Sequence, residues 1–67
     1  MMNKDFHFTV KGIVVEKLPN NNFYVKCDNG EKIMADARIR RIVEGSRVLV
    51  SITVKEPKKG KITSVLR

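Results

Sequence analysis

The sequence predicts a small all-β protein whose five strands close into a barrel. Its 67 residues leave room for one domain with a modest hydrophobic core, so we expect a single domain over residues 1–67. Apolar and polar residues alternate in several short segments, which is the pattern of half-buried strands. Stretches rich in glycine, proline and asparagine separate these segments and predict turns between them.

The first predicted strand covers residues 6–18 and contains one glycine. Apolar residues occupy alternate positions before Gly12, and after it the alternation changes phase to Ile13 and Val15. A glycine inside a strand marks a bulge or bend, so Gly12 is expected to let one strand serve two sheet faces. Residues 18–22, a leucine, a proline and three asparagines, predict the turn that ends this strand.

The second and third strands are predicted to form a hairpin. In residues 23–27 the odd-numbered side chains are apolar and are expected to face the core. The Asn29–Gly30 pair that follows favours a tight turn, because it adopts positive φ angles readily. Residues 31–35 are then the third strand, with Ile33 and Ala35 facing inward.

The second half of the chain is predicted to hold a connector and two strands. Residues 36–43 show the only helical spacing, with Asp36 as the cap, and we expect either one or two helical turns or an extended loop. The fourth strand covers residues 47–54, with its even-numbered residues inward. Residues 56–60 are predicted to be a tight basic turn before the last strand, residues 61–66.

Five strands with one short helix or loop between the third and fourth follow the element order of an OB barrel. An SH3-like barrel is the alternative architecture. The bent first strand and the connector favour the OB barrel, and closure of the barrel removes the exposed strand edges that promote aggregation.

The net charge of +7 lies entirely in the second half of the chain. Residues 1–36 carry five basic and five acidic side chains, whereas residues 37–67 carry nine basic and two acidic ones. Charge of one sign destabilises a small domain by self-repulsion, and a polyanionic partner is its usual reason. Two alternatives are charge for solubility and attraction to an anionic membrane. No amphipathic helix accompanies the charge, so a nucleic acid is the expected partner.

We expect a cytoplasmic protein with no membrane partner. The apolar stretches fall far short of the roughly 20 residues of a membrane span. Charged and polar residues also interrupt the N-terminus, where a signal peptide would have its apolar stretch.

We do not expect an enzyme, a metal or a cofactor. His7 is the only histidine, and no motif pairs it with a nucleophile. Cys27 is the only cysteine and lies on the inward side of its strand, which indicates a core thiol. The sequence has no cluster of metal-ligating residues and no glycine-rich phosphate loop.

Nine residues are predicted to contact RNA. Three arginines within four positions give the connector a dense set of guanidinium groups, which bind phosphates and stack on bases. Lysines around Gly60 form a second basic group, and OB barrels commonly bind nucleic acid beside such loops. An outward tyrosine next to a lysine is typical of sites that stack single-stranded nucleic acid. The nine residues are Tyr24, Lys26, Arg38, Arg40, Arg41, Arg47, Lys58, Lys59 and Lys61.

Five segments, in this order along the chain, resemble the bacterial translation initiation factor one family. They are GIVVEKLPN at residues 12–20, FYV at 23–25, NG at 29–30, EGSRV at 44–48 and KGKI at 59–62. Each motif alone is weak, but their spacing together is specific and covers nearly the whole chain. The connector is shorter than the family's by more than a helical turn.

The resemblance implies an OB domain that binds the decoding region of the small ribosomal subunit through ribosomal RNA. It also implies a monomer that acts with other initiation factors by steric occupation and electrostatic attraction. The arginines of the connector resemble the family's basic segment, and Lys59 and Lys61 resemble its last basic turn. Two other functions stay open. One is a general RNA or single-stranded nucleic-acid chaperone of cold-shock type, dependent on Tyr24, and the other is a protein-interaction module whose charge provides solubility.

Overall fold

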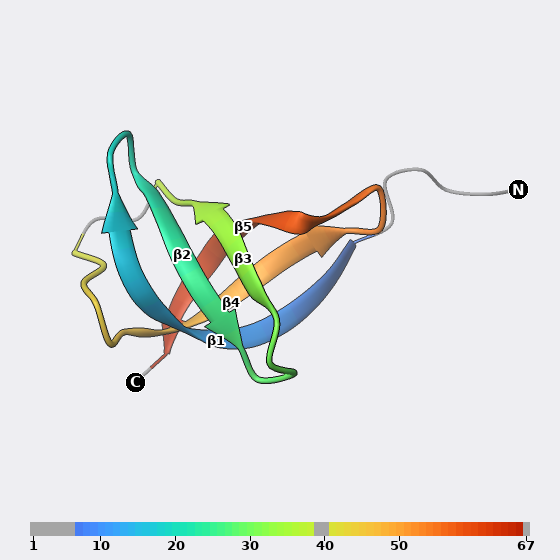
Figure 1. Cartoon of the computed structure of the whole chain (residues 1–67), viewed down its shortest axis with the longest axis horizontal. Helices are drawn as coiled ribbons and strands as arrows, with labels where there is room; N and C mark the ends of the chain where they lie inside the picture. The colour runs from blue at the N-terminus through green and yellow to red at the C-terminus, as the bar shows by residue number, and fades with distance from the viewer. Residues whose placement is uncertain (1–6, 39–40, 67) are drawn as a thin grey trace, which may run out of the picture.

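The predicted all-β barrel is confirmed in a computed structural model, which describes residues 7–38 and 41–66. These residues form five strands and no helix. The strands close into a barrel in the order β1-β2-β3-β5-β4 (Figure 1). Their bounds are β1 His7–Leu18, β2 Asn22–Cys27, β3 Lys32–Asp36, β4 Arg47–Thr53 and β5 Glu56–Leu66. The pairing of β3 with β5 is parallel and the other four pairings are antiparallel, as in the predicted OB barrel.

Strand β1 joins the two halves of the barrel, because it pairs with both β4 and β2. Gly12 and Ile13 belong to both pairings. A Cβ atom on Gly12 would lie 2.5 Å from Val25 Cγ1 and 2.8 Å from the Lys26 carbonyl oxygen. Only glycine therefore allows the two strands to approach this closely, which accounts for the residue at this position.

The predicted change of phase after Gly12 is wrong. Val14 is buried, whereas Ile13 is 44% and Val15 is 42% exposed. Val14 therefore continues the inward pattern of the even-numbered residues, and the alternation does not change at Gly12. The register of β1 against β2 becomes irregular further on, between Val14 and Glu16.

The core is apolar and fills the interior of the barrel, with side chains from all five strands and from the connector. No polar or charged side chain is buried within the described part of the chain. The predicted inward residues of β2, β3 and β4 are buried, except Val54, which is 58% exposed because it follows the end of β4. The buried residues are Val14, Phe23, Val25, Cys27, Ile33, Ala35, Ala37, Ile42, Val48, Val50, Ile52 and Ile62.

The connector is a loop in residues 37–38 and 41–46, so the second of its two predicted forms is the correct one. Asp36 is the last residue of β3 and caps no helix. The Gly45 N–H donates to the Val14 carbonyl oxygen at 2.7 Å, and the Val14 N–H donates to the Ser46 carbonyl oxygen at 2.9 Å. Hydrogen bonds to β1 thus satisfy backbone groups at the end of the connector, while Ile42 is buried against the core.

The predicted basic turn at residues 56–60 is also wrong. The turn lies earlier, where the Glu56 N–H donates to Thr53 Oγ1 at 3.2 Å. Residues 56–60 are the first part of β5, because Lys59 and Gly60 pair with β3 and close the barrel. No helix in the described ranges has the length and hydropathy to cross a membrane.

Candidate nucleic-acid interface

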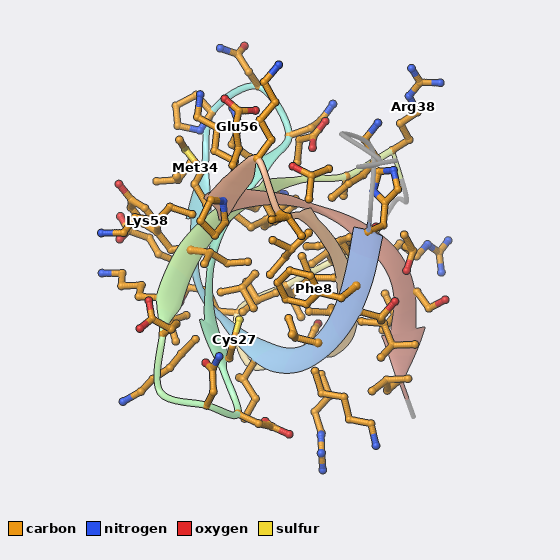
Figure 2. All side chains as sticks on the ribbon, turned by 90° about the vertical axis from the view of Figure 1, so that its right-hand side faces the viewer. Phe8, Cys27, Met34, Arg38, Glu56 and Lys58 are labelled. Carbon is orange, nitrogen blue, oxygen red and sulfur yellow. The ribbon has the colours of Figure 1, made fainter. Side chains whose placement is uncertain are left out.

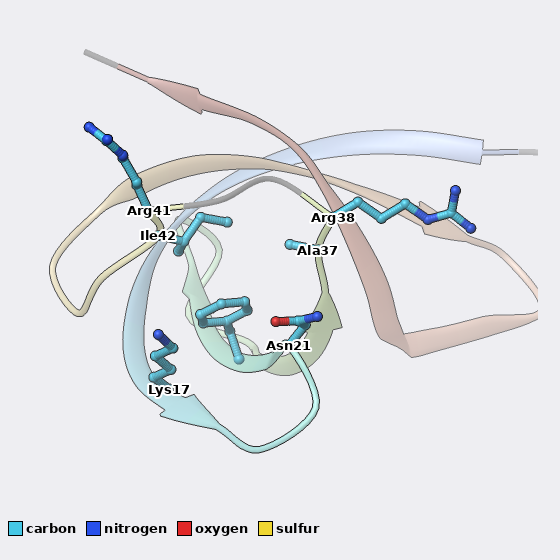
Figure 3. Close-up of a pocket in the computed structure, with 7 residues that line it drawn as sticks. Lys17, Asn21, Ala37, Arg38, Arg41 and Ile42 are labelled. Carbon is cyan, nitrogen blue, oxygen red and sulfur yellow. The ribbon is translucent and has the colours of Figure 1, made fainter.

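A pocket of about 500 Å³ opens at one end of the barrel, between the β1–β2 turn and the connector (Figure 3). We call it the mouth pocket. Seven residues line it: Lys17, Asn21, Phe23, Ala37, Arg38, Arg41 and Ile42.

The floor of the mouth pocket is apolar and well packed. Phe23, Ala37 and Ile42 are all buried, and they come from β2 and from the connector. The Ala37 N–H donates to the Asn21 carbonyl oxygen at 3.1 Å, which joins the connector to the β1–β2 turn. The two loops that form the mouth are therefore held together by main-chain atoms.

The rim of the mouth pocket is positively charged. Lys17, Arg38 and Arg41 are exposed, and Figure 3 shows the two arginines extending from opposite sides of the pocket. Arg41 has a φ of 69°, and Asn21 has a φ of 62°. This left-handed region suits asparagine but is unfavourable for arginine, so the structure holds Arg41 in a strained conformation at the rim.

Lys17 reaches the rim because of the irregularity in β1. After the register shift between Val14 and Glu16, Lys17 pairs with Phe23, whose side chain faces the core. A bulge shifts the alternation by one residue and re-aims the side chains that follow it. Sequence reasoning missed Lys17, since regular alternation gives no sign of where a bulge falls.

The structure brings two of the three predicted arginines to one site. Arg38 and Arg41 both line the mouth pocket, as expected for a basic connector. Arg40 lies outside the described residues.

The three predicted lysines of the last turn lie on strand β5, and Lys58 lines a different pocket from Lys59. Lys59 and Lys61 pair with Met34 and Asp36, and Lys59 lines a second pocket of about 320 Å³ that also includes Asn22. This pocket and the mouth pocket therefore flank the same β1–β2 turn.

Lys58 is separated from the mouth pocket. It lines a small apolar pocket of about 160 Å³ beside Phe8 and Cys27. Figure 2 shows Lys58 and Arg38 projecting from opposite sides of the barrel. Lys58 therefore does not share the basic rim formed by Arg38 and Arg41.

Tyr24 lies on the outside of β2 and is half-buried. The ammonium group of Lys32 lies over the ring of Tyr24, with Nζ 4.6 Å from the ring centroid. The predicted Lys26 is exposed one outward position along β2, and it pairs with Lys32 on β3. Lys32 was not predicted as a site residue, although the Asn29–Gly30 turn places residues 26 and 32 opposite each other.

Cys27 has the predicted character of a core thiol. Burial raises its pKa, and the nearby carboxylates of Asp28 and Glu31 raise it further. A thiol that stays protonated at neutral pH is a poor nucleophile and a poor metal ligand. No group of three or more histidine, cysteine, aspartate or glutamate side chains that suits a metal ion occurs in residues 7–38 and 41–66.

No protein-family model matches the chain. The structure is similar to the solution structure of translation initiation factor one from the Wolbachia endosymbiont strain TRS of Brugia malayi, with a TM-score of 0.75. The two sequences are 33% identical, and the match covers 96% of this chain and 83% of the other. Identity at this level over nearly the whole barrel goes beyond a shared fold, and the chain belongs to the translation initiation factor one family.

Proposed function

We propose that this protein acts in translation initiation and binds the decoding region of the small ribosomal subunit with its mouth pocket. The observation that supports this most is the combination of a basic rim and a buried apolar floor in a member of this family. The proposed ligand is ribosomal RNA. Acting as a cytoplasmic monomer beside other initiation factors is part of the same proposal.

The rim suits a phosphodiester backbone. The guanidinium groups of Arg38 and Arg41 can each give two parallel hydrogen bonds to a phosphate, and the Lys17 ammonium adds a further charge. Bound phosphates release counterions, so binding of this kind weakens steeply as salt concentration rises. Lys59 extends the positive charge to the other side of the β1–β2 turn.

The proposed mechanism is occupation of a site on the subunit, with no bond made or broken. The mouth pocket offers ammonium, guanidinium and amide groups above an apolar floor. Such groups bind and orient phosphates, whereas a nucleophile with its general base is absent from the pocket lining. The protein therefore acts by excluding other ligands and by holding RNA in one arrangement.

Binding to isolated small ribosomal subunits tests this proposal. Arg38→Ala with Arg41→Ala is expected to weaken binding and to lower the slope of log affinity against log salt by about 0.7–0.9 for each phosphate that is no longer bound. Lys55→Ala is the control, because Lys55 is an exposed cation in the β4–β5 turn and lines no part of the pocket. A footprint on the ribosomal RNA should map to the decoding region and disappear with the double variant.

The chaperone alternative makes a different prediction in the same assay. A general single-stranded nucleic-acid binder would bind unstructured oligonucleotides as tightly as it binds subunits. The contact of Lys32 with the Tyr24 ring speaks against it, because a base could stack on that face of the ring only if Lys32 moved away. Equal affinity for both ligands, or unchanged binding after removal of both arginines, would contradict the proposal.

A further inference from the structure

A second opening of the barrel lies at the end opposite the mouth pocket. It leads to the small apolar pocket of about 160 Å³ that Lys58 lines, which we call the far pocket. Phe23 lines the mouth pocket and Cys27 lines the far pocket, and both belong to β2. Val25 lies between them on this strand and is fully buried, so the packed core separates the two pockets. Figure 2 looks into the far end of the barrel, with Phe8 near its centre.

The far pocket lies where strand β5 leaves the ladder near its start. On the β4 side the register passes from Glu56 directly to Gly60, so the three residues between them have no partner there. On the β3 side the pairing begins only at Lys59. Pro57 has no N–H group with which to extend either ladder. The barrel wall is therefore not closed by main-chain pairing at this point, and Pro57 lines the pocket there.

The lining of the far pocket is apolar and comes from all five strands. Each strand contributes one such residue, and the five are Phe8, Cys27, Ile33, Ile52 and Pro57. Burial raises the pKa of the Cys27 thiol, so its sulfur stays protonated and uncharged at neutral pH. A lining without charge favours an apolar ligand over an ion.

The rim of the far pocket is polar and carries charges of both signs. Asn29, Glu31 and Lys58 complete the lining. The Glu31 N–H donates to Asn29 Oδ1 at 2.9 Å, which leaves the amide N–H groups of Asn29 able to donate to a ligand. The carboxylate of Glu31 can accept a hydrogen bond, and the ammonium group of Lys58 can donate one. This rim favours neither an anion nor a cation, but it suits a hydroxyl group, which both donates and accepts.

The volume of the far pocket fits one six-membered ring. An apolar cavity of about 150 Å³ in another protein binds benzene, and the far pocket has about 160 Å³. Water beside the apolar lining has few polar partners, and a ring that displaces weakly held water gains affinity. A protein partner fits less well. Among the described residues, Phe8 and Val54 are the exposed large hydrophobic side chains at this end, which is less than the patch of several hundred Å² that marks a protein interface.

We propose that the far pocket is a binding site for a small neutral molecule with one aromatic ring and one hydroxyl-bearing substituent. The ring lies against the apolar lining, and the hydroxyl group meets Glu31 and Lys58 at the rim. A ligand bound here contacts all five strands, so it stabilises the barrel at the place where the ladder is interrupted. The inference does not depend on the proposed function, because the two pockets share no residue.

Benzyl alcohol is the probe that tests this site, in a titration followed by the amide NMR signals of the full chain. The signals of Cys27, Ile33 and Lys58 are expected to shift in a saturable way, while those of Phe23 and Ala37 stay in place. Naphthol has a second fused ring that exceeds the volume of the pocket and should bind more weakly. The absence of a saturable shift, shifts confined to the mouth pocket, or equally tight binding of naphthol would overturn the proposal.

A pair of variants tests the pocket lining. Phe8→Ala removes one wall and is expected to weaken the affinity for benzyl alcohol by about tenfold, the effect of losing about 50 Å² of apolar contact. Val54→Ala is the matched control, because Val54 is an exposed apolar residue at the same end and lines no part of the pocket. Equal affinities of the two variants would contradict the proposal. The shifts of the wild-type protein test the same site without any change in the core.

Two further comparisons separate this inference from its alternatives. N-acetylphenylalanine amide presents the same ring on a peptide, and tighter binding of this probe than of benzyl alcohol would make the pocket a docking site for a protein side chain, so the inference would be wrong. The protein with Arg38→Ala and Arg41→Ala should bind benzyl alcohol as the wild type does. If this double variant loses subunit binding but the wild type does not bind benzyl alcohol, only this inference fails. If the double variant keeps full subunit binding and benzyl alcohol binds in the far pocket, only the proposed function fails.

Discussion

Lys17 and Phe23 are register partners at the end of the β1–β2 ladder, so a lysine stands opposite a phenylalanine of the core. This pairing exists because the register shift between Val14 and Glu16 reverses which side chains at the end of β1 face inward. The ammonium group of Lys17 consequently lines the rim of the mouth pocket above an apolar floor. The arrangement places the positive charge of Lys17 at the same pocket as Arg38 and Arg41.

Lys17→Met is expected to weaken binding to the small subunit and to lower the salt slope by about 0.7–0.9, since one fewer phosphate is neutralised. Methionine keeps an unbranched apolar stem over Phe23, so the urea midpoint should change little. Lys55→Met is the matched control and should change neither binding nor stability. Equal binding by the Lys17 and Lys55 variants would remove Lys17 from the interface.

The left-handed conformation of Arg41 allows charge and backbone strain to be separated. Arg41→Gly and Arg41→Ala both remove the guanidinium group, so both should weaken subunit binding equally. Their stabilities should differ, because glycine has a φ of 69° without steric cost while alanine keeps the strain. Relief of about 1–2 kcal/mol of backbone strain outweighs the conformational entropy cost of glycine. Arg41→Gly should therefore be more stable than Arg41→Ala by about 0.5 kcal/mol.

Urea denaturation of the two Arg41 variants measures this difference, and binding to subunits measures the shared reduction in affinity. An Arg41→Gly protein less stable than Arg41→Ala would show that residue 41 is not held in the left-handed region in solution.

Gly12→Ala is expected to destabilise the barrel by about 3 kcal/mol, at the upper end of the cost of overpacking. The added methyl group would meet Val25 Cγ1 and the Lys26 carbonyl oxygen, and a carbonyl in a strand cannot move aside as a side-chain tip can. Denaturant unfolding gives the free energy directly.

Gly30→Asn provides the comparison for Gly12→Ala. Gly30 has a φ of 91°, but a Cβ atom built there has no neighbour within 4 Å. Asparagine tolerates positive φ better than other residues, so this variant should lie within about 0.5 kcal/mol of wild type. A similar cost at both glycines would mean that close strand approach at Gly12 is not the cause.

The buried thiol of Cys27 predicts how stability depends on alkaline pH. Burial raises the pKa of this thiol above its ordinary value of 9.0, so the folded state holds the proton more tightly than the unfolded state. That preference contributes its full stabilisation below pH 9 and is lost as pH rises through the folded pKa. Stability should therefore fall above pH 9 more steeply in wild type than in Cys27→Ala, as measured by urea midpoints between about pH 8 and pH 11.

Alkylation gives an independent check of the same thiol. The folded protein should react with iodoacetamide far more slowly than the urea-unfolded protein at about pH 8, since both access and thiolate content are low. Similar rates in the two states would show that the thiol is open to solvent.

Local patterns predicted most of the strands but not how the barrel closes. Alternation identified the inward residues of β2, β3 and β4, and Asn29–Gly30 identified the hairpin. The start of β5 was missed because it is defined by pairing with other strands, including the parallel pairing of Lys59 with Met34 on β3, a contact distant in sequence. The phase of β1 was missed because the register shift falls between Val14 and Glu16 and not at Gly12.

The same distinction applies to the candidate site. Arg38 and Arg41 were predicted from local charge density, and both line the mouth pocket. Lys17 and Lys32 acquire their surroundings from a bulge and from cross-strand register. A bulge and a cross-strand register cannot be recognised from the type of a single residue, so counting charges along the chain does not identify Lys17 or Lys32.

The hydrogen bond from the Ala37 N–H to the Asn21 carbonyl oxygen uses no side-chain atom. The outline of the mouth can therefore be inherited unchanged while the residues around it mutate. Within one lineage, substitutions at the rim would change the charge around the pocket without a new backbone having to evolve. Side chains at the rim can thus change during evolution while the hydrogen bond that joins the two loops is kept.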